Sequence, residues 1–121
     1  MTTHPVPDRY DRFASLTFER PHEHVLRIVM RSPGRLNAAG HEMHRDLADV
    51  WTVVDRDPDI RVAIIAGADG VFSAGGDLDL VRDMADDFAT RIRVHREARD
   101  LVYNVIDCSK PIVSAMAFSS V

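Results

Sequence analysis

The sequence predicts an α/β fold, in which helices pack against a β-sheet. Residues 14–19 alternate between apolar and polar side chains, which is the two-residue period of a half-buried strand. Residues 41–56 instead place apolar side chains at three- and four-residue spacings, the period of an amphipathic helix. An uninterrupted apolar run over residues 62–66 then indicates a buried strand. Strand and helix periods therefore alternate along the chain.

The N-terminal part of the chain is expected to form a β-hairpin. Residues 1–12 contain Pro5, Pro7 and several polar side chains, and we expect them to form a loose arm. The alternating strand 14–19, a turn at 21–24 and an apolar strand at 25–30 then make the hairpin. Prolines and glycines end the second strand, and a short connector leads into the helix 41–56.

The C-terminal part is expected to contain a second long helix and another strand. The helix covers roughly residues 87–107, and Lys110-Pro111 introduces a strand at 112–116. This strand is expected to pair in parallel with strand 62–66 through a right-handed crossover. The apolar side of the long helix is expected to carry Phe88, Ile92, His95, Val102, Val105 and Ile106.

Composition narrows the possible functions. The 121 residues suit one domain with a modest core, and the net charge of −4 makes nucleic acid or an anionic membrane an unsuitable main partner. The single cysteine, Cys108, excludes an internal disulfide and any cysteine zinc pattern, which is typical of a reducing cytosol. No apolar run approaches membrane-spanning length. We therefore expect a cytoplasmic protein whose main partner is neither nucleic acid nor a membrane.

The stretch from Ala66 to Leu78 is the strongest candidate for a binding site. It contains four glycines, it follows the buried strand, and it leads into a second helix start at Asp77. Glycines let a backbone approach a ligand closely, and helix N-termini leave N–H groups without partners. The stretch therefore predicts a cradle for an anion or an oxyanion, with a plain loop as the alternative. The dinucleotide fingerprint, the P-loop and the nucleophile elbow are all absent from it.

Several side-chain patterns suggest a metal, but each lacks a required residue. His41-Glu42-Met43-His44 has arginine where a zinc-protease motif needs its second histidine. Asp55, Asp57 and Asp59 resemble the start of a calcium loop, but the positions of the turn glycine and the last acid hold isoleucine and alanine. We interpret these patterns as a solvated helix start and a polar helix end, with no metal. His95 is interpreted as a core or interface residue.

Four segments, taken in order, carry a resemblance to a known family. They are Arg35-Leu36-Asn37-Ala38, Asp57-Pro58-Asp59-Ile60-Arg61-Val62, Phe72-Ser73-Ala74-Gly75-Gly76-Asp77-Leu78 and Lys110-Pro111-Ile112-Val113-Ser114-Ala115. With these segments the chain resembles the crotonase superfamily, the enoyl-CoA hydratases and isomerases, from about Leu16 to Met116. The resemblance implies a crotonase-like (ββα spiral) fold, of which residues 13–121 would be the N-terminal portion.

The resemblance also implies roles for particular residues. It makes the backbone N–H of Gly76 one of two donors that bind the thioester oxygen of an acyl-CoA as an enolate forms. Ala74, Gly75, Asp77 and Leu78 would shape this pocket, and the segment Arg35, Leu36 and Ala38 would lie along the adenine and pantetheine of CoA. The acyl-CoA is then the substrate, no further cofactor is implied, and the complete protein would form trimers or dimers of trimers.

The sequence also departs from the family pattern. After Met116 the family continues into a second glycine-rich loop with the other oxyanion donor, whereas this chain has Ala117-Phe118-Ser119-Ser120-Val121. No residue aligns with the two glutamates that move protons in the hydratases. We therefore expect either an acyl-CoA hydratase or isomerase whose missing groups lie elsewhere, or a truncated chain. A truncated chain would bind CoA weakly or serve only as an assembly partner. A metal-dependent protein is the third and weakest alternative.

Overall fold

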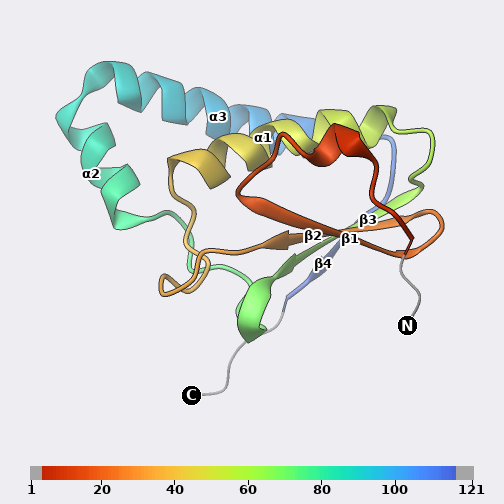
Figure 1. Ribbon diagram of the computed structural model, residues 1–121. Coiled ribbons are helices and arrows are strands. Elements are labelled where there is room, and N and C mark those ends of the chain that lie inside the picture. Colours follow the sequence, from red (N-terminus) through yellow and green to blue (C-terminus); the bar gives the residue numbers. More distant parts are fainter. Residues whose placement is uncertain (1–3, 117–121) are drawn as a thin grey trace.

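The structure, a computed structural model, describes residues 4–116 and confirms the α/β fold (Figure 1). Its single four-stranded sheet has the order β1-β2-β3-β4. Strands β1 (Leu16–His22) and β2 (Val25–Met30) are antiparallel, while β3 (Val62–Gly67) pairs in parallel with both β2 and β4 (Ile112–Ala115). The hairpin and the parallel pairing of the last two strands were both predicted correctly.

Three α-helices complete the fold: α1 (His41–Arg56), α2 (Leu78–Asp86) and α3 (Phe88–Asp107). In Figure 1, α1 and α3 run side by side over the sheet, and α2 lies beyond the start of α1. The bounds of α1 are those that the sequence predicts, and α3 begins one residue later than expected. Asp77 and Asp87 accept hydrogen bonds at the N-termini of α2 and α3, so each helix start is capped.

The hairpin turn is tighter than the sequence predicts. Strand β1 continues to His22, which pairs with Val25, so only Glu23 and His24 remain for the turn. The expected turn at 21–24 was wrong because Pro21 was taken as the end of the strand. Pro21 instead lies where the ladder is irregular, between Glu19 and His22, and such a position tolerates a residue without an N–H.

The hydrophobic core lies between α1 and the sheet. The inner face of α1 contributes Val50, Trp51 and Val54, each at most 3% exposed. Leu26 and Ile28 of β2 and Ala63 of β3 are fully buried in the same cluster. The amphipathic pattern of residues 41–56 therefore identified the buried face of α1 correctly.

The prediction of a loose arm over residues 1–12 was wrong for its last part. Residues Asp8–Tyr10 form a short 3-10 helix, and the side chain of Tyr10 is 1% exposed. The Tyr10 hydroxyl donates a 2.6 Å hydrogen bond to Asp57, and Arg9 pairs with the same carboxylate at 2.6 Å. Burial and this hydrogen bond raise the pKa of Tyr10 far above its usual value. One buried aromatic ring thus anchors a segment whose composition is otherwise polar.

The expected apolar side of α3 was wrong for most of its residues, although Val105 does pack against the core. His95, Phe88, Val102 and Ile106 are exposed, and Val94 is the residue of α3 that is fully buried. The stripe that faces α1 includes two polar residues whose partners lie on α1: Glu97 contacts His44, and Asn104 donates a 2.7 Å hydrogen bond to the backbone oxygen of Ala48. A hydrophobic pattern cannot identify a contact stripe that contains polar side chains.

Residues 1–3 and 117–121 lie outside the described part of the chain. The departure from the family pattern at Ala117–Val121 therefore stays a sequence observation. Within residues 4–116, none of the helices has the length and apolar character needed to cross a membrane.

Candidate functional site

The candidate site is built from two loops that lie side by side, residues 31–40 before α1 and residues 68–77 before α2. Ala39 and Gly76 form a parallel bridge, in which the Ala39 N–H donates to the Gly75 oxygen at 2.7 Å. The Asp77 N–H donates to the Ala39 oxygen at 2.9 Å, and the Ala74 N–H donates to the Leu36 oxygen at 2.9 Å. Backbone hydrogen bonds therefore fix the two loops relative to each other.

Asn37 is the side chain that joins the two loops. It is 5% exposed and has a positive φ of 56°, a conformation that asparagine tolerates better than most residues. Its Oδ1 accepts a hydrogen bond from the Ser32 N–H at 2.9 Å, and its Nδ2 donates to the oxygens of Ala68 and Val71 at 2.9 and 2.5 Å. The sequence analysis did not assign this role to Asn37. An asparagine in a short connector between two glycines is typical of a residue whose side chain bonds to nearby backbone, and it could have indicated the role.

Gly67, the last residue of β3, has a steric role at the start of the second loop. A Cβ atom on Gly67 would lie 1.8 Å from the backbone oxygen of Val71 and 2.4 Å from that of Phe72. The chain folds back against its own backbone at this point, so that no side chain fits. Gly67 therefore permits the return of the loop, which brings residues 74–77 beside residues 36–39.

The backbone N–H of Gly76 is free to meet a ligand. In this parallel bridge, Ala39 donates to the oxygen of Gly75 and accepts from the N–H of Asp77, so Gly76 itself forms neither hydrogen bond. The N–H of Gly76 therefore points away from the first loop. Among residues 4–116 it has no hydrogen-bond partner, and Gly76 is exposed. A Cβ atom there would meet only Leu80 Cδ2, at 3.9 Å, so an alanine fits without strain.

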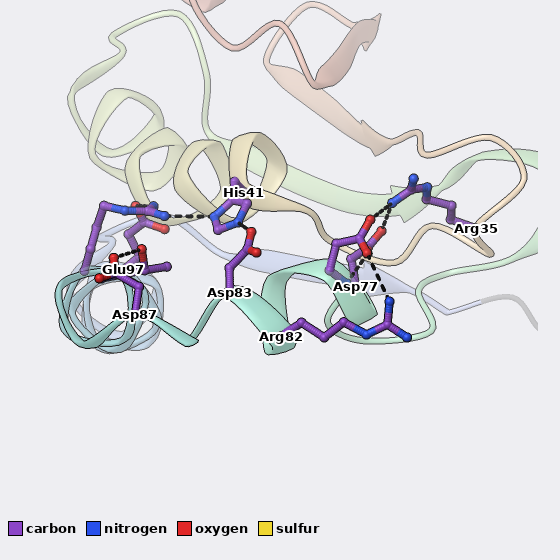
Figure 2. A network of polar contacts seen from close by, with 10 residues as sticks. Arg35, His41, Asp77, Arg82, Asp83, Asp87 and Glu97 are labelled. Atoms are coloured by element: carbon purple, nitrogen blue, oxygen red, sulfur yellow. Dashed lines mark hydrogen bonds and ion pairs between the residues drawn. The ribbon is translucent and has the colours of Figure 1, made fainter. Parts of the chain in front are cut away.

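Asp77 joins the end of the second loop to the start of α2. Its side chain is 8% exposed, and its Oδ1 accepts a 2.9 Å hydrogen bond from the Asp79 N–H. Arg35 pairs with the other carboxylate oxygen (Figure 2). The Asp79 N–H, and then Arg35, hold the pKa of Asp77 below its usual value, while Asp77 raises the pKa of Arg35. Asp77 is therefore an ionised cap whose charge is already compensated.

These elements surround a hollow of about 490 Å³. Six of the eight site residues predicted from the sequence line it: Arg35, Ala38, Ala74, Gly76, Asp77 and Leu78. Gly75 is not among the lining residues, and Leu36 lines a separate hollow on the other side of its loop. Two further lining residues, Asp79 and Arg82, come from α2 and were not predicted. A helix start at Asp77 was expected, but the sequence did not indicate which side chains of that helix face the hollow.

The histidines at the start of α1 are engaged with acids on other helices. His41 Nε2 lies 2.7 Å from Asp83 Oδ2, and His44 Nδ1 lies 2.9 Å from Glu97 Oε1. The interpretation as a solvated helix start was wrong for His44, whose side chain is 15% exposed. Among residues 4–116, no three histidine, cysteine or acidic side chains are grouped so that they could hold a metal ion.

Comparison with known proteins identifies the family. A family model described as enoyl-CoA hydratase/isomerase matches residues 20–119. The chain belongs to the enoyl-CoA hydratase/isomerase family. It is 30% identical over 116 residues to the human mitochondrial Delta(3,5)-Delta(2,4)-dienoyl-CoA isomerase, an alignment that covers 86% of this chain and 34% of the human protein. A second relative, an enoyl-CoA hydratase of Mycobacterium tuberculosis, is 47% identical over 55 residues, which are 46% of this chain and 21% of that one.

Solved structures confirm the crotonase-like fold of this family member. A crystal structure of an enoyl-CoA hydratase/isomerase from Mycobacterium paratuberculosis superposes with a TM-score of 0.79 at 30% identity, covering 84% of this chain and 41% of that one. A β-diketone hydrolase from the cyanobacterium Anabaena has a TM-score of 0.80 at 22% identity, over 97% of this chain and 46% of its own, and shows the fold alone. The chain thus spans about a third of the length of its first curated relatives.

Proposed function

We propose that the chain provides half of an acyl-CoA site, in which the backbone N–H of Gly76 donates to the thioester oxygen of the substrate. The observation that carries this proposal is the N–H of Gly76, a residue that lines the hollow. Among residues 4–116 this N–H has no hydrogen-bond partner, while the residues on both sides of it are held by backbone hydrogen bonds. A donor fixed in this way needs no reorganisation when negative charge develops on the oxygen of an enolate.

Two electrostatic features favour negative charge at this position. Gly76 directly precedes the capped N-terminus of α2, where the helix dipole is positive. The carboxylate of the next residue, Asp77, is directed to the Asp79 N–H and to Arg35. It therefore adds little repulsion to an oxyanion at the Gly76 N–H. Beside Gly76, the segment of Arg35 and Ala38 also lines the hollow and is available for the adenine and pantetheine of CoA.

The reaction also requires a second oxyanion donor and groups that transfer protons. The family resemblance places both beyond Met116, so we propose that they come from outside residues 4–116. They would be supplied by further polypeptide or by another subunit of a trimer or hexamer. Hydration and double-bond isomerisation of unsaturated acyl-CoA thioesters are the proposed reactions, in line with the names of the relatives. The cytoplasmic location expected from the single cysteine also stays a prediction.

A pair of substitutions at Gly76 tests the oxyanion assignment. Gly76→Pro removes the N–H, whereas Gly76→Ala keeps it and fits the available space. In the assembled enzyme that supplies the missing groups, we expect Gly76→Pro to lower crotonyl-CoA turnover about a hundredfold to a thousandfold, the scale of losing one oxyanion donor, and Gly76→Ala to change it little. In the chain alone, the amide resonance of Gly76 should shift when butyryl-CoA is added. Unchanged turnover in a folded Gly76→Pro variant, or an unmoved amide resonance with bound ligand, contradicts the assignment.

The second candidate function is that of a non-catalytic assembly partner. The observation that favours it is a set of large apolar side chains, each more than 50% exposed, on α3, on β4 and just after β4: Val102, Tyr103, Ile106, Val113 and Met116. Such side chains commonly mark a surface that contacts protein. Two measurements distinguish the two functions. An assembly partner forms a complex in analytical ultracentrifugation, but it neither binds butyryl-CoA nor hydrates crotonyl-CoA.

A further inference from the structure

Helix α2 forms one wall of the hollow, and it is attached to the rest of the molecule by few apolar contacts. Leu78, Asp79 and Arg82 of α2 line the hollow. Of the residues in α2, Leu80 is fully buried, whereas the apolar side chains of Leu78 and Val81 are 70% and 53% exposed. Burial of one leucine is a small apolar contact for a helix that spans Leu78–Asp86. Polar contacts must therefore contribute to the position of α2.

A chain of polar contacts joins α2 to both other helices (Figure 2). Asp83, in the middle of α2, contacts Nε2 of His41, the first residue of α1, at 2.7 Å. Nδ1 of the same ring lies 2.8 Å from Arg93 Nη2 on α3. Arg93 continues to Glu97 at 2.9 Å, and Glu97 contacts His44 of α1 at 2.9 Å. His41 is thus the point at which all three helices meet through hydrogen bonds.

The contacts determine which nitrogen of His41 carries the proton. Arginine has only donors, so Nδ1 of His41 must accept the hydrogen bond from Arg93. The proton of the neutral ring then lies on Nε2 and is donated to the carboxylate of Asp83. The His41 ring thus accepts one hydrogen bond and donates another. An apolar side chain of similar size can form neither of them.

The place of His41 in the chain connects this network to the hollow. His41 directly follows the loop that contributes Arg35 and Ala38 to one wall, and Asp83 lies one residue after Arg82, which lines the other. The hydrogen bond between His41 and Asp83 therefore joins the start of α1, which follows the first loop, to α2, which supplies Arg82.

We propose that His41 is a positioning residue that holds α2 against α1 and α3 and so sets the separation of the two walls of the hollow. The side chains of His41 and Asp83 are 38% and 55% exposed, so the contact is screened by water and weak. Such a contact restrains the position of α2 without fixing it rigidly. Where it concerns the acyl-CoA, this inference rests on the proposed function.

Hydrogen exchange of the chain, followed by mass spectrometry, tests the restraint without any ligand. We expect His41→Leu to raise the exchange rates of amides in α2 about fivefold, while those in the core strands change less than twofold. His41→Gln, which keeps one donor and one acceptor, should return α2 to within about twofold of the wild-type rate. Glu42→Gln, a change at an exposed neighbour on the same helix turn, is the matched control.

Asp83→Ala removes the same hydrogen bond from the α2 side and serves if His41→Leu does not fold. Equal acceleration throughout the chain, no acceleration in α2, or no recovery with His41→Gln would each overturn the proposal. Calorimetry with butyryl-CoA then separates the two inferences. If the wild-type chain binds and His41→Leu binds equally well despite faster exchange, His41 does not position the wall. If the wild-type chain does not bind, the proposed function fails, and the exchange pattern alone decides whether His41 restrains α2.

Discussion

The loop pair 31–40 and 68–77 and the helix α2 border the same hollow, yet different kinds of contact hold them in place. The loops are joined by backbone hydrogen bonds and by the buried side chain of Asn37. Helix α2 is held by one buried leucine and by side-chain contacts that water reaches. Buried hydrogen bonds define geometry because leaving them unmade is costly, whereas exposed ion pairs contribute little. The Gly76 N–H therefore lies on the rigid side of the hollow, and Leu78 and Arg82 on the adjustable side.

The largest expected effect comes from Gly67, on which the path of the second loop depends. Gly67→Ala places a Cβ atom against the backbone of Val71 and Phe72, where only movement of the main chain relieves the contact. We expect a loss of more than about 4 kcal/mol in the free energy of unfolding, or no folding at all. Urea denaturation measures this loss, with Gly76→Ala as the matched control. A Gly67→Ala variant as stable as wild type would show that the loop pair is not rigid.

Substitutions at Asn37 should have the next largest effect. Removing the side chain leaves the Ser32 N–H and the oxygens of Ala68 and Val71 without this partner. We expect Asn37→Gly, which tolerates the positive φ, to lower the free energy of unfolding by about 2–3 kcal/mol. Asn37→Ala should cost about 1 kcal/mol more because alanine disfavours that φ. The difference between the two variants in urea denaturation separates the hydrogen bonds from the backbone strain; equal losses would contradict the role of φ.

A pair of substitutions in α2 measures how this helix is anchored. Leu80 is 4% exposed, so Leu80→Ala should lower the free energy of unfolding by about 2 kcal/mol. Val81→Ala, at the exposed neighbour, should change it by less than about 0.5 kcal/mol. Urea denaturation monitored by circular dichroism gives both values. A large effect of Val81→Ala would mean that more of α2 is packed than the structure shows, and it would weaken the contrast between the two walls.

The smallest expected effect is a dependence of stability on pH at Asp77. Its pKa is lowered in the folded chain by the Asp79 N–H and by Arg35. The resulting stabilisation is fully present above the pKa of an unfolded aspartate, about 3.9, and is lost as the pH falls through the lower folded value. Wild type should therefore lose more stability than Asp77→Asn between about pH 5 and pH 3 in thermal unfolding. Parallel curves for the two proteins would show that Asp77 is not held ionised.

The regular elements were well predicted because their signals are local. The apolar spacing of residues 41–56 and the break at Pro58 fixed the bounds of α1, and the uninterrupted apolar run identified β3. Six of the residues to which the resemblance assigns a role line the hollow. It did not indicate that α2 supplies two more, because their approach depends on how that helix lies against α1 and α3.

Polar residues that act across the fold were the ones that sequence reasoning misjudged. Tyr10 and Asp57 are 47 positions apart, and each looks like an ordinary surface residue in its own segment. His44 and Glu97 are 53 positions apart, and their contact decides which side of α3 faces α1. Asn37 shows the same effect at a separation of 31 from Ala68. A polar side chain is buried only when its partner is brought to it, so the local pattern gives no sign of it.

By itself, the sequence determined the kinds of elements, most of their bounds, the family resemblance and the small residues that leave the Gly76 N–H accessible. These properties follow from side-chain period, from glycine and proline chemistry and from short motifs, all of which lie within a few neighbouring residues. The tertiary structure alone decided that Asn37 joins the loops, that Tyr10 anchors the N-terminal segment and that His41 lies between three helices. Each of these depends on tertiary contacts that pair donors and acceptors across 30 or more positions of the chain.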